Sequence, residues 1–334
     1  MIPAGKIAEL IAKAEHIVIT AHKSPDGDAV GSTLGLFHAL THAGKDCNVI
    51  LPDGFAQFIA WMPGAGKILL HDKEPDRCAE LISQSDLIFC LDYNSLDRTG
   101  NLASLLVEAT APRVLIDHHP FPSDEFAVRF SDTAHSSTCE MVTELLLAMD
   151  MKQHITRDAA QCLYSGLVTD TGSFRYSCTS PRTHQIAAEL IGTGIENAKI
   201  HNQLFDTQSE GRLKLLGYAL SEKMVVDKAN QTAWFVLSKA ELKRFNHQKG
   251  DTEGLVNYGL AIEGIRAAAI FVEHEDKVKI SLRSKDSVPV NLIAKEYFSG
   301  GGHTNAAGGI WESDMDSLIE KWKSIYPAFM ATHA

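Results

Sequence analysis

Short, continuously apolar runs that alternate with helical patterns constrain the fold of the first half of this chain more than any other feature. Such runs are typical of strands covered on both faces, as in a parallel sheet with helices on either side. The four runs lie at residues 16–21, 47–51, 86–91 and 113–116. A helical pattern at residues 6–14 precedes the first strand, and a second at 29–43 separates the first strand from the next; Gly44 follows this second pattern, as glycine often follows a helix. This alternation predicts an α/β domain with a parallel sheet and helices on both faces.

The pattern changes twice in the second half of the chain. Three helical patterns come first, at residues 137–149, 157–168 and 183–192. Strand signals then return at residues 222–226, 232–237, 266–272 and 278–282, with helical patterns at 291–298 and 315–326. We therefore predict a first domain over residues 1–195, a helical linker over 196–210 and a smaller α/β domain over 211–334.

Length and composition are those of a globular protein of two domains. The chain has 334 residues, of which 45% are apolar and 22% are charged, and a disordered chain would have far fewer apolar residues. No run approaches the roughly 18 apolar residues that a membrane helix needs, and the first residues form an amphipathic pattern rather than a secretory signal. The six cysteines never form a C-x-x-C pair, so we expect reduced core residues. These features predict a cytoplasmic protein without membrane contact.

The formal net charge of −11 bears on the partners of the chain. A protein that follows a long phosphate backbone usually carries a basic face, because neutralising phosphates supplies most of its affinity. The acidic total therefore favours a small anionic substrate in a focused pocket over a long duplex.

Acidic residues and histidines follow three of the four predicted strands of the first domain. The three clusters are His22-x-x-x-Asp26-x-Asp28, Asp92 and Asp117-His118-His119. In an open parallel sheet, ligands bind in the crevice outside the carboxyl ends of the strands. We therefore expect the clusters to converge on one crevice. A further acidic residue, Asp170, ends a predicted helix at a glycine turn and could close the same site.

Each cluster also has an ordinary structural explanation. Asp26 and Asp28 could cap the helix that begins at Ala29, as Asp commonly does. Asp92 and Asp170, taken singly, could be cap or turn residues, and the paired histidines could lie in a solvated loop. These ordinary explanations must hold four times independently, whereas a metal site explains the three clusters and Asp170 at once.

The donor types indicate the class of metal. Imidazole and carboxylate without thiolate suit manganese, with iron, cobalt or zinc as alternatives. Six of these residues are taken as ligands, namely His22, Asp26, Asp28, Asp92, His118 and Asp170, and six ligands that include four carboxylates are too many for one tetrahedral zinc. They suit two ions bridged by a carboxylate, roughly 3.5–4 Å apart, as in phosphatases and nucleases. We therefore predict two divalent metal ions, with Mn²⁺ the first choice.

The motifs, in this order, resemble those of the DHH phosphoesterase superfamily, which is named for an Asp-His-His triplet. The C-terminal half carries a second likeness, to the glycine-rich signature of the substrate domain associated with that family. The matching segment is Phe298-Ser299-Gly300-Gly301-Gly302-His303. The resemblance covers nearly the whole chain. It implies that the first domain is the catalytic DHH domain and that the second is the DHH-associated substrate-binding domain.

The resemblance also implies individual roles. The residues that match metal ligands are His22, Asp26, Asp28, Asp92, His118 and Asp170. Among them, Asp92 and Asp170 match the bridging pair. His119 matches a histidine that faces the scissile phosphate in relatives, and Asp117 would orient a neighbouring imidazole. Arg98 matches an arginine near the phosphate.

The glycine run has a chemistry of its own. A backbone without side chains can approach a ligand closely and offer its N–H groups to an anion, although an ordinary flexible loop is the alternative. Arg283 offers a planar fork suited to phosphate, with a solvated surface arginine as the alternative. With the family match, Arg283 and His303 would hold the 5′ end of a substrate. Three further residues are expected to bind it, namely Ser284, Gly301 and Gly302.

Among the branches of the family, the chain resembles cytoplasmic nano-RNases that also dephosphorylate 3′-phosphoadenosine 5′-phosphate. Single-strand exonucleases of the family are longer, and its manganese pyrophosphatases carry a different, basic C-terminal signature. The resemblance thus implies hydrolysis of short single-stranded oligonucleotides and nucleoside bisphosphates. One alternative is a phosphodiesterase of linear or cyclic dinucleotide second messengers, and another is a non-catalytic nucleotide sensor. The sequence leaves a homodimer open.

Two further features have ordinary interpretations. Four histidines without partners at metal spacing are expected at the surface: His71, His135, His154 and His184. Ser137 and Glu140 are spaced as a capping box at the start of a helix.

Overall fold

The computed structural model describes residues 2–333, and the chain divides into two compact units between Thr207 and Gln208. The helical linker was predicted over 196–210, a range that contains this division and one helix. The two units are described separately below.

The first unit is built on a six-stranded sheet in the order β3-β2-β1-β4-β5-β6, in which every neighbouring pair is parallel. Its strands are β1 (His16–Thr20), β2 (Asp46–Leu51), β3 (Leu69–Leu70), β4 (Leu87–Leu91), β5 (Arg113–Asp117) and β6 (Val128–Ser131). The predicted parallel sheet is therefore confirmed. The two edge strands, β3 and β6, were not predicted.

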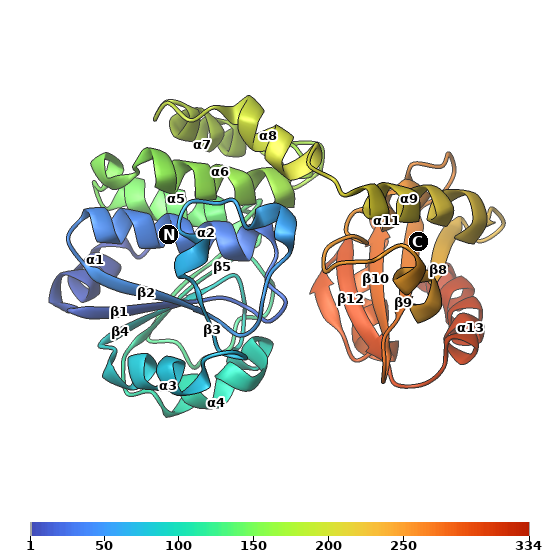
Figure 1. The fold of residues 1–334 in the computed structure, drawn as a ribbon, viewed down its shortest axis with the longest axis horizontal. Coiled ribbons are helices and arrows are strands. Elements are labelled where there is room, and N and C mark those ends of the chain that lie inside the picture. Colours follow the sequence, from blue (N-terminus) through green and yellow to red (C-terminus); the bar gives the residue numbers. More distant parts are fainter. Residues whose placement is uncertain (1, 334) are drawn as a thin grey trace. The chain divides into compact units, whose positions relative to one another are not determined.

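Helices cover both faces of this sheet, as predicted, and Figure 1 shows α2, α5 and α6 on one face with α3 and α4 on the other. The helices are α1 (Ala4–Lys13), α2 (Gly27–His42), α3 (Pro75–Gln84), α4 (Ala103–Glu108), α5 (Thr138–Ala148), α6 (Arg157–Asp170), α7 (Pro181–Ile191) and α8 (Asn197–Phe205). Short 3₁₀ turns are η1 (Gln57–Ile59), η2 (Ala65–Lys67), η3 (Leu96–Leu102) and η4 (Lys152–His154). Alternate strand residues enter the two cores: Ile17 and Ile19 pack toward α2, and Val18 packs toward α3.

The second unit holds a mixed sheet in the order β11-β12-β10-β9-β8-β7, of which only the β8–β9 pair is parallel among the described residues. Its strands are β7 (Met224–Asp227), β8 (Thr232–Leu237), β9 (Ala267–Glu273), β10 (Val278–Ser284), β11 (Gly301–His303) and β12 (Ala306–Trp311). Its helices are α9 (Glu210–Tyr218), α10 (Lys239–Arg244), α11 (Leu255–Leu260), α12 (Val290–Tyr297) and α13 (Met315–His333), with a π turn, η5 (Ala219–Lys223).

Two cores flank this second sheet. One packs α12 and α13 against one face, with the indole of Trp322 fully buried. The other packs α9 and α11 against the opposite face, around Phe235 and Ile270. The predicted smaller α/β unit is confirmed. The strand predicted from residue 222 begins later, at Met224, because the preceding residues form the π turn.

The glycine run forms a strand rather than a flexible loop. Gly301 to His303 make β11, which pairs antiparallel with β12. A Cβ on Gly300 would collide with the Gly308 carbonyl group, and Gly302 has a φ of 137° that favours glycine. Close approach of the two strands therefore explains two of the three glycines.

Candidate metal centre

The carboxyl ends of β1, β4 and β5 lie side by side, because these strands are sheet neighbours and run in the same direction. The strand order reverses at β1: the chain goes outward to β2 and β3 and then returns to β4 on the other side. At such a switch point the connecting segments diverge and leave a crevice. The three predicted clusters all follow strands at this point.

Asp92 follows β4 directly, and its backbone is strained. Its φ of 63° lies in the left-handed region that residues other than glycine rarely adopt, at a cost on the order of 1–3 kcal/mol. Its N–H still donates to the carbonyl oxygen of Ile116 at 3.1 Å, so the residue remains tied to β5. Asp92 is 2% exposed. A strained, buried carboxylate of this kind is typical of a functional site.

The two carboxylate oxygens of Asp92 face different histidines. Oδ2 lies 3.4 Å from Nε2 of His22, and Oδ1 lies 3.5 Å from Nε2 of His118. Three groups of potential ligands contain Asp92, each with donor atoms within 4.8 Å of one another: His22, Asp26 and Asp92; Asp28, Asp92 and His118; and Asp92, Asp117 and His119. In the first two groups, different oxygens of Asp92 face the two histidines for which metal binding was predicted.

Asp170 joins the second group from the end of a helix. It is the last residue of α6, and its Oδ2 lies 3.3 Å from Nε2 of His118. The C-terminal end of a helix carries a partial negative charge, so a carboxylate there is stabilised by a nearby cation. The structure therefore brings together all six residues for which metal binding was predicted.

The N-terminus of α5 holds Asp28 in place. The carboxylate of Asp28 accepts hydrogen bonds from the N–H groups of Thr138 at 2.6 Å and Cys139 at 2.9 Å. N–H groups in the first turn of a helix have no partner within that helix. The hydroxyl of Thr138 also donates to Oδ1 of Asp92 at 3.0 Å. Thr138 was not predicted as a site residue, and its signal was the capping motif beside it.

The capping explanation holds for Asp26 but not for Asp28. Oδ1 of Asp26 accepts from the N–H groups of Asp28 at 3.0 Å and Ala29 at 3.1 Å, which caps α2. The same oxygen lies 4.0 Å from Nε2 of His22, so capping and membership of the first group coincide. Asp28 instead accepts from the start of α5.

Glycines let α2 and α6 approach closely and so bring Asp28 beside α6. A Cβ on Gly31 would lie 2.6 Å from the carbonyl oxygen of Cys162. A Cβ on Gly166 would lie 3.0 Å from the Cα of Asp28. A spacing of four places residues on one helix face, and α2 carries Gly27, Gly31 and Gly35. This pattern was a signal in the sequence that the prediction did not use.

The crowded charges of the centre change one another's pKa values. Burial and then the charge of Asp92 raise the pKa of Asp28 to about 7. Burial and then the charge of Asp28 raise the pKa of Asp170 well above its ordinary value. Burial acts to lower the pKa of His22, but the carboxylates of Asp92 and Asp26 outweigh it and raise that pKa to about 9. Without cations the centre therefore retains protons, and divalent ions would supply the missing positive charge in their place.

The orientation of the two histidines fits metal binding. Nδ1 of His22 lies 2.9 Å from the carbonyl oxygen of Lys23, and Nδ1 of His118 lies 3.4 Å from that of His135. A carbonyl only accepts, so each Nδ1 carries the proton. Each Nε2 then faces carboxylate oxygens, an arrangement that is repulsive unless a proton or a metal ion lies between them. Backbone carbonyls commonly orient ligating histidines in this way, so these donors fit a pair of divalent ions.

His119 lies beside the centre with a different partner. Its Nδ1 lies 2.7 Å from Oδ1 of Asp117 and 3.8 Å from Oδ1 of Asp92. Asp117 is fully buried, and no hydrogen-bond partner for its other oxygen exists among residues 2–333. The strong contact with Asp117 fixes the ring of His119, which remains half-buried.

In the second unit, two predicted substrate-binding residues lie in one row of the sheet. Arg283 on β10 and His303 on β11 both pair with Ala306 on β12. Directly opposite residues in antiparallel strands project from the same face, so a methyl side chain separates the two larger ones. The next row on the same face, two residues along each strand, holds Ser281, Gly308 and Gly301. Its side chains are small or absent.

A Cβ on Gly301 would meet no atom within 4 Å. Packing therefore does not explain this glycine, unlike Gly300 and Gly302. We refer to these two rows, in which all side chains except those of Arg283 and His303 are small or absent, as the floor.

Comparison with known proteins gives the family of the chain. The chain matches the DHH family, N-terminal domain, over residues 16–167 and the DHHA1 domain over residues 227–326. The probable bifunctional oligoribonuclease and PAP phosphatase NrnA of Streptococcus mutans is 30% identical over 87% of this chain and 88% of that protein. The chain belongs to the DHH family.

Other DHH-family relatives cover nearly the whole chain. The bifunctional oligoribonuclease and PAP phosphatase NrnA of Bacillus subtilis is 29% identical over 91% of each protein. The crystal structure of an exopolyphosphatase-related protein from Bacteroides fragilis has 38% identity and a TM-score of 0.91, with 97% of each chain covered. The predicted family resemblance and fold are confirmed.

Two other predicted residues of the DHH-family chain have contacts of a different kind. The side chain of Arg98 is exposed, and its carbonyl oxygen accepts the N–H of Lys23 at 2.8 Å, next to His22. Ser284 is buried, and its hydroxyl donates to the Val288 carbonyl oxygen at 2.6 Å. The hydroxyl of Ser284 thus stabilises the turn after β10.

Two expectations about individual residues were wrong. His135 was expected at the surface, but its side chain is only 15% exposed, and its Nε2 lies 2.9 Å from Glu144. The cysteines were expected in the core, yet Cys178 is exposed. The capping motif is also modified: Ser137 caps α5, while Glu140 accepts the N–H of Ser136 at 2.9 Å.

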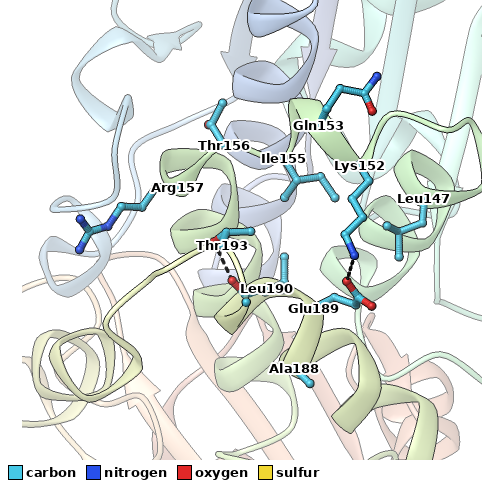
Figure 2. Close-up of a pocket in the computed structure, with 11 residues that line it drawn as sticks. Leu147, Lys152, Gln153, Ile155, Thr156, Arg157, Ala188, Glu189, Leu190 and Thr193 are labelled. Carbon is cyan, nitrogen blue, oxygen red and sulfur yellow. Dashed lines mark hydrogen bonds and ion pairs between the residues drawn. The ribbon is translucent and has the colours of Figure 1, made fainter.

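A surface hollow of about 610 Å³ lies between α5, α6 and α7, away from the centre (Figure 2). Lys152 at its rim is paired with Glu189 at 2.5 Å. None of the predicted site residues lines this hollow. No helix within residues 2–333 is long and apolar enough to cross a membrane.

Proposed function

We propose that this DHH-family chain is a phosphoesterase that hydrolyses very short oligonucleotides and 3′-phosphoadenosine 5′-phosphate with the help of two divalent metal ions. The observation that carries the proposal is the position of Asp92, whose two oxygens face two separate groups of donors. One ion would need only one such group. The names of the Streptococcus and Bacillus relatives support the substrate class.

The two groups assign the ligands. His22, Asp26 and Asp92 would hold one ion, and Asp28, Asp92, His118 and Asp170 the other. Asp92 would contact both. Asp170 is a second candidate for a bridge, because the charge of Asp26 acts on its pKa as well. A bound pair of ions polarises a phosphoryl oxygen and lowers the pKa of water, and donors without thiolate favour Mn²⁺.

His119 would act on the scissile phosphate. Asp117 accepts its Nδ1–H at 2.7 Å, which leaves Nε2 as the nitrogen available to a phosphate oxygen. A buried carboxylate behind an imidazole holds the ring in one tautomer and orientation. His119 can therefore donate a hydrogen bond to charge that develops on the phosphate, or a proton to the departing oxygen.

Arg283 and His303 would bind one end of the substrate. They border a floor of small residues that allows a phosphate or sugar to lie close to the backbone. The guanidinium supplies paired donors for phosphate, and the imidazole supplies a third donor. Recognition of a terminal phosphate favours dinucleotides and other very short chains, because every phosphodiester bond in them lies near an end.

A substrate panel tests the proposed function. Manganese-loaded full-length protein would be assayed on a dinucleotide, a pentanucleotide, a 24-nucleotide RNA, 3′-phosphoadenosine 5′-phosphate, a cyclic dinucleotide and pyrophosphate. We expect the dinucleotide, the pentanucleotide and the bisphosphate to be hydrolysed far faster than the 24-nucleotide RNA. The reason is that each added phosphate must lie on a protein of net charge −11. Equal efficiency on the long RNA, or a preference for pyrophosphate or the cyclic dinucleotide, would reject the proposal.

A further inference from the structure

Phe121 is an aromatic residue exposed beside the candidate centre. Within residues 2–333 no large apolar residue is more exposed, since 81% of it is open to solvent. It follows His119 by two residues, in the segment that leaves the carboxyl end of β5. Two residues span at most about 7 Å of chain. The ring is therefore anchored close to the imidazole that would act on the scissile phosphate.

The backbone of Phe121 is held in an unfavourable conformation. Its φ is 62°, in the left-handed region, although the residue before a proline prefers an extended backbone. The residues on both sides are Pro120 and Pro122, which restrict the segment further. Strain of this kind persists only where the surrounding structure imposes it, and it is frequent at ligand sites.

Asn94 holds this segment in place. Its side-chain amide donates to the carbonyl oxygen of Pro120 at 2.7 Å and lies 3.5 Å from that of Phe121. The backbone carbonyl oxygen of Asn94 accepts the N–H of Ser123 at 2.8 Å. Asn94 follows the proposed bridging residue Asp92 by two positions, so the segments after β4 and β5 are tied together.

We propose that Phe121 is a stacking platform for the nucleobase next to the scissile phosphate. The inference rests on the proposed function and adds a specificity residue to it. A ring that is 81% exposed offers a flat apolar face to a base. Every base has such a face, and aromatic stacking binds single-stranded nucleotides with little sequence preference. Purines, with the larger ring system, should gain more from it than pyrimidines.

The test compares matched substrates and variants. Full-length manganese-loaded protein would be assayed on an adenine dinucleotide and on its analogue without the base beside the scissile phosphate. We expect Phe121→Ala to lower kcat/KM for the dinucleotide about 5- to 100-fold and to leave the abasic analogue unchanged. Phe121→Trp should retain activity, whereas Phe121→Leu should lose most of it. Val107→Ala, at an exposed residue of α4, is the control and should behave as the wild type.

Two outcomes would overturn the inference alone. An equal loss on both substrates would show that the ring supports the loop of His119, and no loss on either would indicate that it serves another contact, such as a partner protein. A wild type that hydrolyses neither substrate would contradict the proposed function instead. In that case, the stacking role of Phe121 would be tested by measuring the binding of adenosine 5′-monophosphate by calorimetry. We expect weaker binding by Phe121→Ala than by wild type, and equal binding would reject the platform.

Discussion

At the scale of single residues, adjacent positions in this chain have opposite surroundings. His118 and His119 are neighbours, but successive side chains after a strand point to different sides. His118 is 5% exposed and directs Nε2 toward carboxylates. His119 is half-buried and is fixed through Nδ1 by Asp117. One histidine is thus arranged to hold a cation and the other to face a substrate.

This difference leads to a prediction for His119. His119→Ala should lower kcat by about 10²- to 10⁴-fold, the range for a lost acid or base, with a smaller change in KM, because the imidazole acts in the transition state. Steady-state kinetics on a dinucleotide, with metal analysis of the same preparation, would measure both effects. His184→Ala, at an exposed histidine in α7, serves as a control. Loss of bound manganese in His119→Ala would show instead that His119 is a ligand.

A second prediction concerns Arg283 on β10. Arg283→Ala should raise KM for a 5′-phosphorylated dinucleotide at least about 10-fold, since a hydrogen bond to a charged group contributes about 1.5–3 kcal/mol. A small artificial phosphodiester without a 5′-phosphate should be hydrolysed as before. Lys279→Ala is a matched control, because Lys279 lies on the same strand and the same face. An equal loss on the artificial ester would contradict a role in holding the substrate end.

Some residues near the site could be predicted from the sequence, and others could not. The chemical types of His22, Asp26, Asp28, Asp92, His118 and Asp170 indicated a metal centre, and the structure brings them together. Thr138 and His135 escaped prediction because they act through a helix N-terminus and a backbone carbonyl. These backbone contacts depend on where the chain lies and not on residue type, although the hydroxyl of Thr138, which donates to Asp92, does depend on it.

At the scale of elements, the crossing of α2 and α6 positions Asp28 relative to Asp170. The two helices approach through glycines, and an added Cβ at Gly31 would lie 2.6 Å from a carbonyl oxygen of α6. Neither helix can move away without separating carboxylates of the second donor group. Packing of these helices and binding of the ions are therefore coupled.

Substitution of Gly31 tests this coupling. Gly31→Ala should lower the free energy of unfolding by about 1–3 kcal/mol, as overpacking usually does, and should also weaken manganese binding. Urea unfolding and calorimetric titration would measure the two effects. The matched control is Gly5→Ala in α1, where an added Cβ meets nothing within 4 Å, so alanine should be neutral or slightly stabilising. A destabilised Gly31→Ala with unchanged metal affinity would refute the coupling.

The central elements of the fold were easier to predict than the edges. β4 is buried at every position, and its continuous apolar run marks it clearly. β3 has two residues, and β11 consists largely of glycine, which has no strand preference. Pairing with β12 makes β11 a strand. Pairing depends on residues distant in the sequence, so local patterns do not reveal it.

At the scale of the whole molecule, each unit has its own cores, and the charge of the metal-free centre lies in the first. The pKa of His22 is about 9 rather than 6.5, and that of Asp28 is about 7 rather than 3.8. Both groups bind protons more tightly in the folded chain than in the unfolded chain. The stability contributed by Asp28 is therefore lost as the pH rises from about 4 through 7, and that of His22 as it rises from 6.5 through 9.

The midpoint temperature of thermal unfolding of the metal-free protein should accordingly decrease as the pH is raised from 6 to 9. Manganese replaces the retained protons, so the increase in midpoint on adding it should grow over the same range. Scanning calorimetry with and without Mn²⁺ would record both trends. His22→Gln should flatten the dependence of the metal-free protein above pH 7. A midpoint that rises with pH in metal-free wild type would contradict the assignment of the retained protons.

The central claim is that Asp92 joins two metal ions in one centre. The most direct measurement is manganese titration of metal-free protein, by calorimetry and electron paramagnetic resonance, for wild type, Asp92→Asn and the exposed control Asp76→Asn on α3. We predict two magnetically coupled ions in wild type and control. Asp92→Asn should lose the coupling and at least one ion, keep its circular dichroism spectrum and lose several orders of magnitude in turnover. One ion per wild-type chain, or two coupled ions and near-normal turnover in Asp92→Asn, would contradict the account.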